Sequence, residues 1–102
     1  LGPASAIVIA SLIAGNAVLK TLNLDGHRLD LPKLRGTDSV TSLNLSHKGL
    51  GPASAIVIAS LIAGNGALKS LNLWDNSIGD EGAKALASAL RVNGVLTTLN
   101  LE

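Results

Sequence analysis

The sequence predicts an α/β solenoid, in which short parallel strands and helices alternate along a curved stack. One observation is a strand-like pattern, an apolar residue followed by x-x-Leu-Asn-Leu, that begins at Leu19, Val40, Leu68 and Leu96. These starts lie 21, 28 and 28 residues apart. The second is the segment LGPASAIVIASLIAGN, which occupies residues 1–16 and again 50–65, a separation of 49 residues that equals 21 plus 28. Such self-similarity is typical of repeat architectures.

Each full repeat is expected to supply a strand followed by a helix. In the third full repeat, polar residues separate the leucines at 68, 71 and 73, and all three leucines are predicted to face inward. Apolar residues then recur at helical spacing, at Ala83, Leu86, Ala87 and Leu90. Strand–helix–strand order favours parallel pairing with right-handed crossovers. Strands pair about 4.8 Å apart, whereas helices pack about 8–10 Å apart. The stack therefore has to curve, with strands on the concave face and helices on the convex face.

We interpret residues 1–102 as one domain, divided into a partial repeat 1–18, repeats 19–39, 40–67 and 68–95, and a partial repeat 96–102. The repeat 19–39 is thin, because it contains Pro32 and Gly36 and lacks helical periodicity, so its outer side is expected to be extended or a single short turn. Beside it, large apolar residues of the duplicated segment either fill a gap or form an exposed apolar patch on the convex face. These residues are Ile7, Val8 and Leu12 in the first copy and Ile56, Val57 and Leu61 in the second.

The composition excludes several function classes. The formal net charge is +1, which gives no electrostatic reason to bind nucleic acid or an anionic membrane. No apolar run reaches the roughly 18 residues of a membrane span. The chain has no cysteine, which excludes cysteine metal sites and fits a cytoplasmic location. His27 and His47 are predicted to lie in turns at the solvent edge, so we expect no catalytic residue, metal, cofactor or small-molecule substrate.

The repeat pattern L-x-x-L-x-L-x-x-N-x-L resembles the leucine-rich repeat. The 28-residue repeat from Leu68 to Val95, with IGDEGAKALASAL, is similar to the ribonuclease-inhibitor-like class, which also forms the sensor domains of NOD-like receptors. The resemblance implies a non-enzymatic fold whose concave face and rim contact proteins. It also implies an asparagine that bonds the backbone of neighbouring turns. Asn76 retains it, whereas His27 and Lys48 replace it in the two preceding repeats.

The concave face is the first candidate binding surface. Two columns of short polar side chains are predicted across the sheet, and they either keep the sheet ordered and wet or contact a partner. Trp74 is either an interface hot spot or a rim residue folded over its neighbours. The candidate protein-binding residues are Lys20, Thr21, Asn23, Asp25, Ser42, Asn44, Lys69, Ser70, Asn72, Trp74, Thr98 and Asn100.

The two ends form the second candidate surface. The last segment is a strand without a helix, and the first is a helix without a strand, so one copy can complete a repeat of the next. Such a head-to-tail contact closes a ring or continues as a filament. The alternative is a segment of a larger receptor or sensor that binds another protein. The residues predicted for self-association are Ile7, Val8, Leu12, Leu96, Leu99 and Leu101.

The two copies are almost identical. Between residues 1–24 and 50–73, only Ala17, Val18 and Thr21 differ from their counterparts. Drift erodes duplicated segments, so the sequence indicates either a recent duplication or an engineered, consensus-derived chain.

Overall fold

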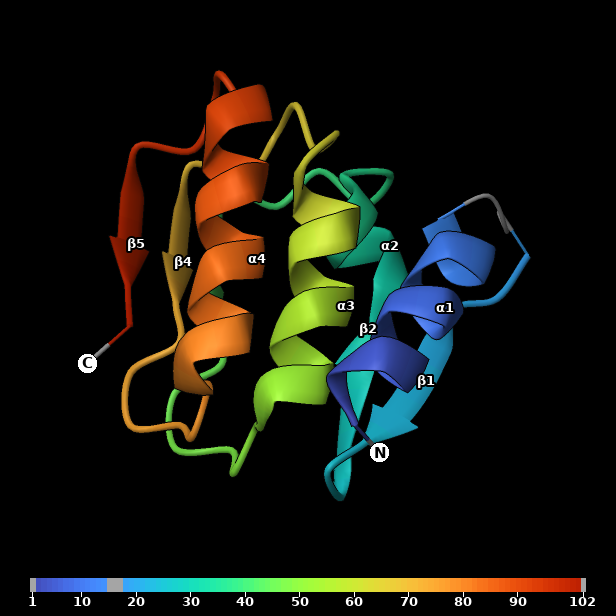
Figure 1. The fold of residues 1–102 in the computed structure, drawn as a ribbon. Coiled ribbons are helices and arrows are strands. Elements are labelled where there is room, and N and C mark those ends of the chain that lie inside the picture. The colour runs from blue at the N-terminus through green and yellow to red at the C-terminus, as the bar shows by residue number, and fades with distance from the viewer. Residues whose placement is uncertain (1, 15–17, 102) are drawn as a thin grey trace.

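The computed structural model describes residues 2–14 and 18–101, and it has mixed α/β content. Three helices lie side by side in one layer and the strands lie behind them (Figure 1). The helices of this row are α1 (Pro3–Ala14), α3 (Pro52–Ile62) and α4 (Gly79–Val92). A short fourth helix is α2 (Leu31–Arg35). The strands are β1 (Thr21–Leu24), β2 (His27–Asp30), β3 (Ser42–Asn44), β4 (Ser70–Asn72) and β5 (Thr98–Asn100).

Strands β3, β4 and β5 form a parallel sheet, as the repeat spacing predicts. Its register follows the 28-residue period, since Leu43 pairs with Leu71 and Leu71 pairs with Leu99. The central strand is the best covered, because the leucines at 68, 71 and 73 have no exposed surface. Leu50, Ile58 and Leu86 are also fully buried and belong to the same core.

The first repeat contradicts the prediction of one continuous parallel sheet. Strand β1 pairs antiparallel with β2, and Leu24 lies opposite His27, so only Asp25 and Gly26 form the turn. Both turn residues have positive φ, 55° and 74°, as a type I′ hairpin requires. The Asp-Gly pair therefore turns the chain back beside β1, and the structure has two small sheets in place of one. His27 consequently begins a strand and does not occupy the predicted turn.

The rest of the thin repeat forms the extended β2 and the short helix α2, so both of the forms expected for this segment occur in it. The Asp30 side chain caps α2 by accepting a hydrogen bond from Lys33 N (3.2 Å), and Pro32 lies in its first turn. Gly36 ends the helix with φ 93°. A Cβ at Gly36 would lie 2.6 Å from Asn65 Oδ1, so this position also needs glycine for close approach.

Helix α3 is the centre of the molecule, between α1 and α4 (Figure 1). Its apolar residues continue around the helix, and both flanks are buried, as expected for a helix covered on all sides. The same sequence in α1 exposes its outer side. Both interpretations of the apolar positions are therefore correct, one for each copy: Ile56, Val57 and Leu61 fill the core, whereas Ile7, Val8 and Leu12 form an exposed patch.

Two asparagines join successive repeats at the C-terminal ends of α3 and α4. Asn65 is almost fully buried, and its amide donates to the carbonyls of Lys33 and Leu34, both at 3.0 Å. Asn93, 28 residues later, donates in the same way to the carbonyls of Ile62 (2.6 Å) and Asn65 (3.0 Å).

In the described residues, no helix is long and apolar enough to cross a bilayer.

Candidate functional site

The polar face of the three-stranded sheet carries the predicted columns. Ser42, Ser70 and Thr98 are paired in register, as are Asn44, Asn72 and Asn100. The amides of Asn44 and Asn72 in the second column bond to the turns that follow them. Asn44 Oδ1 accepts hydrogen bonds from Ser46 N (3.0 Å) and Ser46 Oγ (2.7 Å), and Asn72 Oδ1 accepts one from Trp74 N (2.9 Å). These bonds fix the turns that follow the strands.

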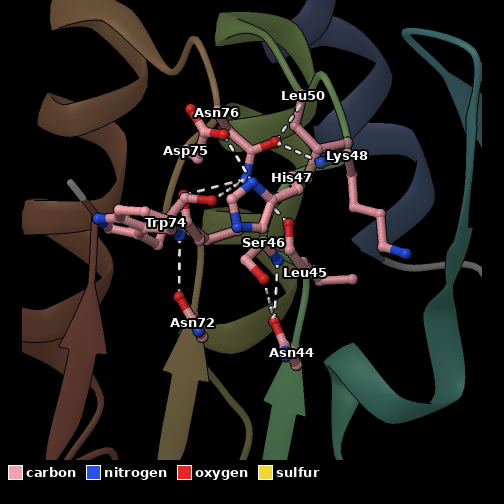
Figure 2. A network of polar contacts seen from close by, with 11 residues as sticks. Asn44, Leu45, Ser46, His47, Lys48, Leu50, Asn72, Trp74, Asp75 and Asn76 are labelled. Atoms are coloured by element: carbon pink, nitrogen blue, oxygen red, sulfur yellow. Dashed lines mark hydrogen bonds and ion pairs between the residues drawn. The ribbon is translucent and has the colours of Figure 1, made fainter.

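The turns after β3 and β4 bring Trp74 and a histidine–aspartate pair together at the rim (Figure 2). His47 Nδ1 lies 2.6 Å from Asp75 Oδ2, and the rings of His47 and Trp74 meet edge-on with centroids 4.9 Å apart. Both His47 and Asp75 have left-handed φ, near 55°, which histidine and aspartate tolerate better than most residues. Trp74 remains 43% exposed. The rim therefore presents an indole whose position is fixed by its neighbours.

Asn76 holds these turns in place, as the family resemblance implies. Its Oδ1 accepts hydrogen bonds from Lys48 N (3.1 Å) and Leu50 N (3.0 Å), and its Nδ2 donates to Leu45 O (2.8 Å). One side chain thus satisfies three backbone groups of the preceding repeat, which gives the rim a rigid base.

At the rim, the Ser46 hydroxyl and the His47 ring do not form a nucleophile–base pair. The Ser46 hydroxyl donates to Asn44 and not to His47, and the side chains of His47 and Asp75 are both more than half exposed. Among the described residues, no group of three or more His, Cys, Asp or Glu side chains lies close enough to hold a metal ion. These side chains can supply hydrogen bonds and aromatic contact to a protein surface.

The first-repeat members of the predicted site lie elsewhere. Thr21 and Asn23 are on the hairpin strand β1, so they do not extend the two polar columns. Asp25 lies in the hairpin turn and caps α3: its Oδ2 accepts hydrogen bonds from Gly51 N (2.9 Å) and Ser54 Oγ (2.6 Å). The Ser54 bond lowers the pKa of Asp25 and outweighs the effect of burial, which raises it. Lys69 is exposed and immediately precedes β4, at the end of the strand opposite the rim turns, and Lys20 precedes the hairpin.

The residues predicted for self-association lie at opposite sides of the molecule. Ile7, Val8 and Leu12 are 55%, 60% and 72% exposed on α1. The leucines at 96, 99 and 101 are only half-buried around β5. An open groove of about 370 Å³ crosses the helix row between these sides, and no charged side chain lines it.

Sequence reasoning missed three features that had local signals. Asp25–Gly26, between alternating leucines, is the standard signal for a two-residue hairpin. His47 and Asp75 are 28 residues apart, so the repeat period alone places them side by side. Asn65 and Asn93 share the same period and precede successive strands.

The parallel strands, rigid rim turns and polar sheet face indicate a repeat protein with surfaces suited to binding proteins. Residues 65–87 match a family model described as Leucine Rich repeat, and this match supports a leucine-rich-repeat protein. Such repeats are generally protein-binding and not enzymatic. Searches of curated proteins and of solved structures gave no match to the chain.

Proposed function

We propose that this chain is a non-catalytic scaffold of the ribonuclease-inhibitor-like class that associates head-to-tail with further copies of itself. In this proposal the strand–helix units form a right-handed solenoid that continues from copy to copy. The strand β5 of one copy and the helix α1 of the next would complete one repeat.

One observation carries the proposal: the same sequence is covered in one copy and open in the other. Ile56, Val57 and Leu61 of α3 are at most 6% exposed, whereas their identical counterparts on α1 are more than half exposed. Exposed aliphatic side chains grouped on one helix are typical of an interaction surface. Covering them as they are covered in α3 would stabilise an assembly by about 1.5–3 kcal/mol for each large side chain fully buried.

The opposite side of the molecule supports the same proposal. The leucines at 68, 71 and 73, in and beside β4, are fully buried, whereas the equivalent leucines 96, 99 and 101 are only half-buried. In the described residues, no strand pairs with the outer edge of β5. An open parallel edge with partly exposed leucines favours association.

Light scattering on a size-exclusion column, over a wide concentration range, tests the proposal. We expect a mass that is a multiple of 10.3 kDa. Leu99→Asp and Leu101→Asp should each reduce that mass to the monomer, because a carboxylate cannot be buried there without a partner. A monomeric wild-type chain at every concentration would refute self-association.

Matched variants separate a loss of interface from a loss of fold. Thr98→Asp adds the same charge to β5 on its exposed polar face, and Trp74→Ala removes the rim indole. Both should leave the mass unchanged. Circular dichroism should show that all four variants keep their helices. An oligomer that persists with Asp at both 99 and 101 contradicts the role of this edge.

A second candidate is the binding of another protein by the polar face, as a segment of a larger leucine-rich-repeat receptor or sensor. The partly exposed Trp74, held against His47, favours it, because tryptophan contributes strongly to interfaces. If this is the function, Trp74→Ala and Lys69→Glu should abolish capture of a partner that the wild type retains. Capture by both variants would exclude this face.

The near-identity of the two copies supports an origin by recent duplication or by engineering, and the absence of cysteine agrees with a proposed cytoplasmic location. Fractionation of cells that express the chain tests the location.

A further inference from the structure

The three helices of the row share one arrangement of flank residues. Offsets of 49 and 28 residues align them. One flank, named here the C-side flank, carries two alanines and an Ile or Leu: Ala6, Ala10 and Ile13 in α1, Ala55, Ala59 and Ile62 in α3, and Ala83, Ala87 and Leu90 in α4. The opposite flank, named the N-side flank, consists of Ser5, Val8 and Leu12 in α1, Ser54, Val57 and Leu61 in α3, and Gly82, Ala85 and Ala89 in α4.

The two kinds of flank meet inside the chain. A Cβ at Gly82 would lie 2.8 Å from the Cβ of Ala55, so the N-side flank of α4 packs directly on the C-side flank of α3. Helix α3, in the middle of the row, has both of its flanks buried. The repeated contact therefore joins the C-side flank of one helix to the N-side flank of the next.

The two outer helices each leave one flank open, and the open flanks are opposite in kind. In α1 the C-side flank is buried, whereas Val8 and Leu12 of the N-side flank are exposed. In α4 the relation is reversed: Gly82 and Ala89 are buried, whereas Ala83 and Ala87 are exposed and Leu90 is 37% exposed. The molecule thus presents both halves of its own internal helix contact, one at each end of the row (Figure 1).

We propose that the C-side flank of α4 in one copy packs against the N-side flank of α1 in the next. This inference rests on the self-association proposed above and assigns Ala83, Ala87 and Leu90 as its second surface. The short side chains of Ala83 and Ala87 leave room for Val8 and Leu12, as interdigitating helices require. None of the six side chains assigned to the two open flanks is charged, so these side chains add no unpaired charge to the contact.

A second copy is the partner that these surfaces fit. The contact between the two kinds of flank already occurs within the chain, and each copy supplies the half that the other lacks. A two-fold dimer would instead join like to like, either two alanine flanks or two Val–Leu flanks. The inferred contact is heterologous, so it adds copies in one direction.

Single cysteines test the contact cleanly, because the chain has none of its own. Leu12→Cys and Ala87→Cys are purified separately, mixed, and treated with a short bis-maleimide cross-linker. We expect a covalent dimer, about twice 10.3 kDa, in the mixture and not in either variant alone. Lys84→Cys is the matched control, because Lys84 lies on α4 but lines a groove shared with Ile7 and Ile56. Its mixture with Leu12→Cys should give no dimer.

The cross-linking results distinguish the head-to-tail flank contact from a two-fold contact and from a monomer. A dimer from Ala87→Cys alone or from Leu12→Cys alone would overturn the inference in favour of a two-fold contact. If the mixture gives no cross-link although light scattering still shows oligomers, the flank contact is wrong and self-association stands. If the wild type is monomeric at every concentration, both the inference and the proposed function fail.

Discussion

Residues 1–24 and 50–73 have nearly the same sequence but different surroundings. Both begin with the same helix, yet α3 is buried on two flanks and α1 on one. Both continue into a Leu-Lys-x-Leu-Asn-Leu strand, yet β4 is the central strand of a parallel sheet and β1 is half of an antiparallel hairpin. Identical local sequence therefore specifies the element, and the neighbours specify its pairing and burial.

The two copies diverge where their sequences first differ beyond the strand. Asp25 and Gly26 follow β1, whereas Trp74 and Asp75 follow β4. The first pair adopts two successive left-handed conformations and reverses the chain at once. After β4, only Asp75 has positive φ among the residues that lead to Ile78, and the chain goes on to helix α4. Two residues thus redirect a strand whose own sequence differs from its counterpart only at Thr21, which is Ser70 in the second copy.

The largest expected effect concerns the buried and exposed copies of one leucine. Leu61→Ala should reduce the free energy of unfolding by about 2–5 kcal/mol, because it leaves a cavity beside α1 and the core. Leu12→Ala makes the same change at a position that is 72% exposed, and should cost less than about 0.5 kcal/mol. Urea denaturation followed by circular dichroism measures both.

The protein concentration in this experiment should be low enough for light scattering to show a monomer. Otherwise the loss of an intermolecular contact at Leu12 would add to the measured difference. Equal destabilisation by the two variants would mean that α1 is covered in solution as α3 is, and the contrast between the copies would be wrong.

The regular part of the fold could be predicted from the sequence. The 28-residue period gives β3, β4 and β5 with their register, because all three have the same leucine spacing. The period fails at the thin repeat, where the Asp25–Gly26 turn outweighs the leucine pattern that favoured a fourth parallel strand. The repeat period predicts only the features that neighbouring repeats share. The hairpin depends on Asp25–Gly26, a pair that the next two repeats lack.

The candidate site was predictable to a similar extent. The columns at Ser42 and Asn44 follow from strand alternation and the 28-residue period, and both residues pair in register with β4. The position of Asp25 at the start of α3 required knowledge of the hairpin, and the contact of His47 with Asp75 required the paired left-handed turns. Whether the exposed flank of α1 contacts a second copy stays a prediction.

A smaller effect is expected at the turn that separates the two copies. Gly26 has φ 74° and an open surrounding, so Gly26→Ala meets no side chain but takes up a conformation that alanine disfavours. The expected loss is about 1–2 kcal/mol in the free energy of unfolding. Thermal denaturation should show a lower midpoint.

Gly66→Ala is the control for this change. Gly66 has no positive φ and nothing within 4 Å of an added Cβ, and the first copy already has Ala17 there. It should leave stability within about 0.5 kcal/mol of the wild type or raise it slightly. If Gly26→Ala proved as neutral as this control, the hairpin would not depend on the left-handed turn.

The smallest expected effect concerns the carboxylate cap at the N-terminus of α3. Asp25→Asn should reduce the free energy of unfolding by roughly 0.5–1 kcal/mol near neutral pH, because a charged cap on α3 is replaced by a neutral one. The pKa of Asp25 is lowered in the folded chain. The stabilisation is therefore complete above the ordinary aspartate pKa, about 3.9, and is lost as the pH falls through the folded value. Urea denaturation between pH 6 and pH 2 should show the wild-type advantage shrinking in that range.

Ser54 and Ser5 have the same neighbours in sequence, and replacing each of them completes this test. Ser54 is fully buried and donates to Asp25, whereas Ser5, its counterpart on α1, is exposed. Because the Ser54 bond is the largest cause of the lowered pKa, Ser54→Ala should weaken the pH dependence assigned to Asp25. In the monomer, Ser5→Ala should leave that dependence unchanged, since in the described residues no carboxylate accepts a hydrogen bond from Ser5. If Ser5→Ala altered the acid limb as much as Ser54→Ala does, a carboxylate would also cap α1, and the two helix starts would not differ as the structure shows.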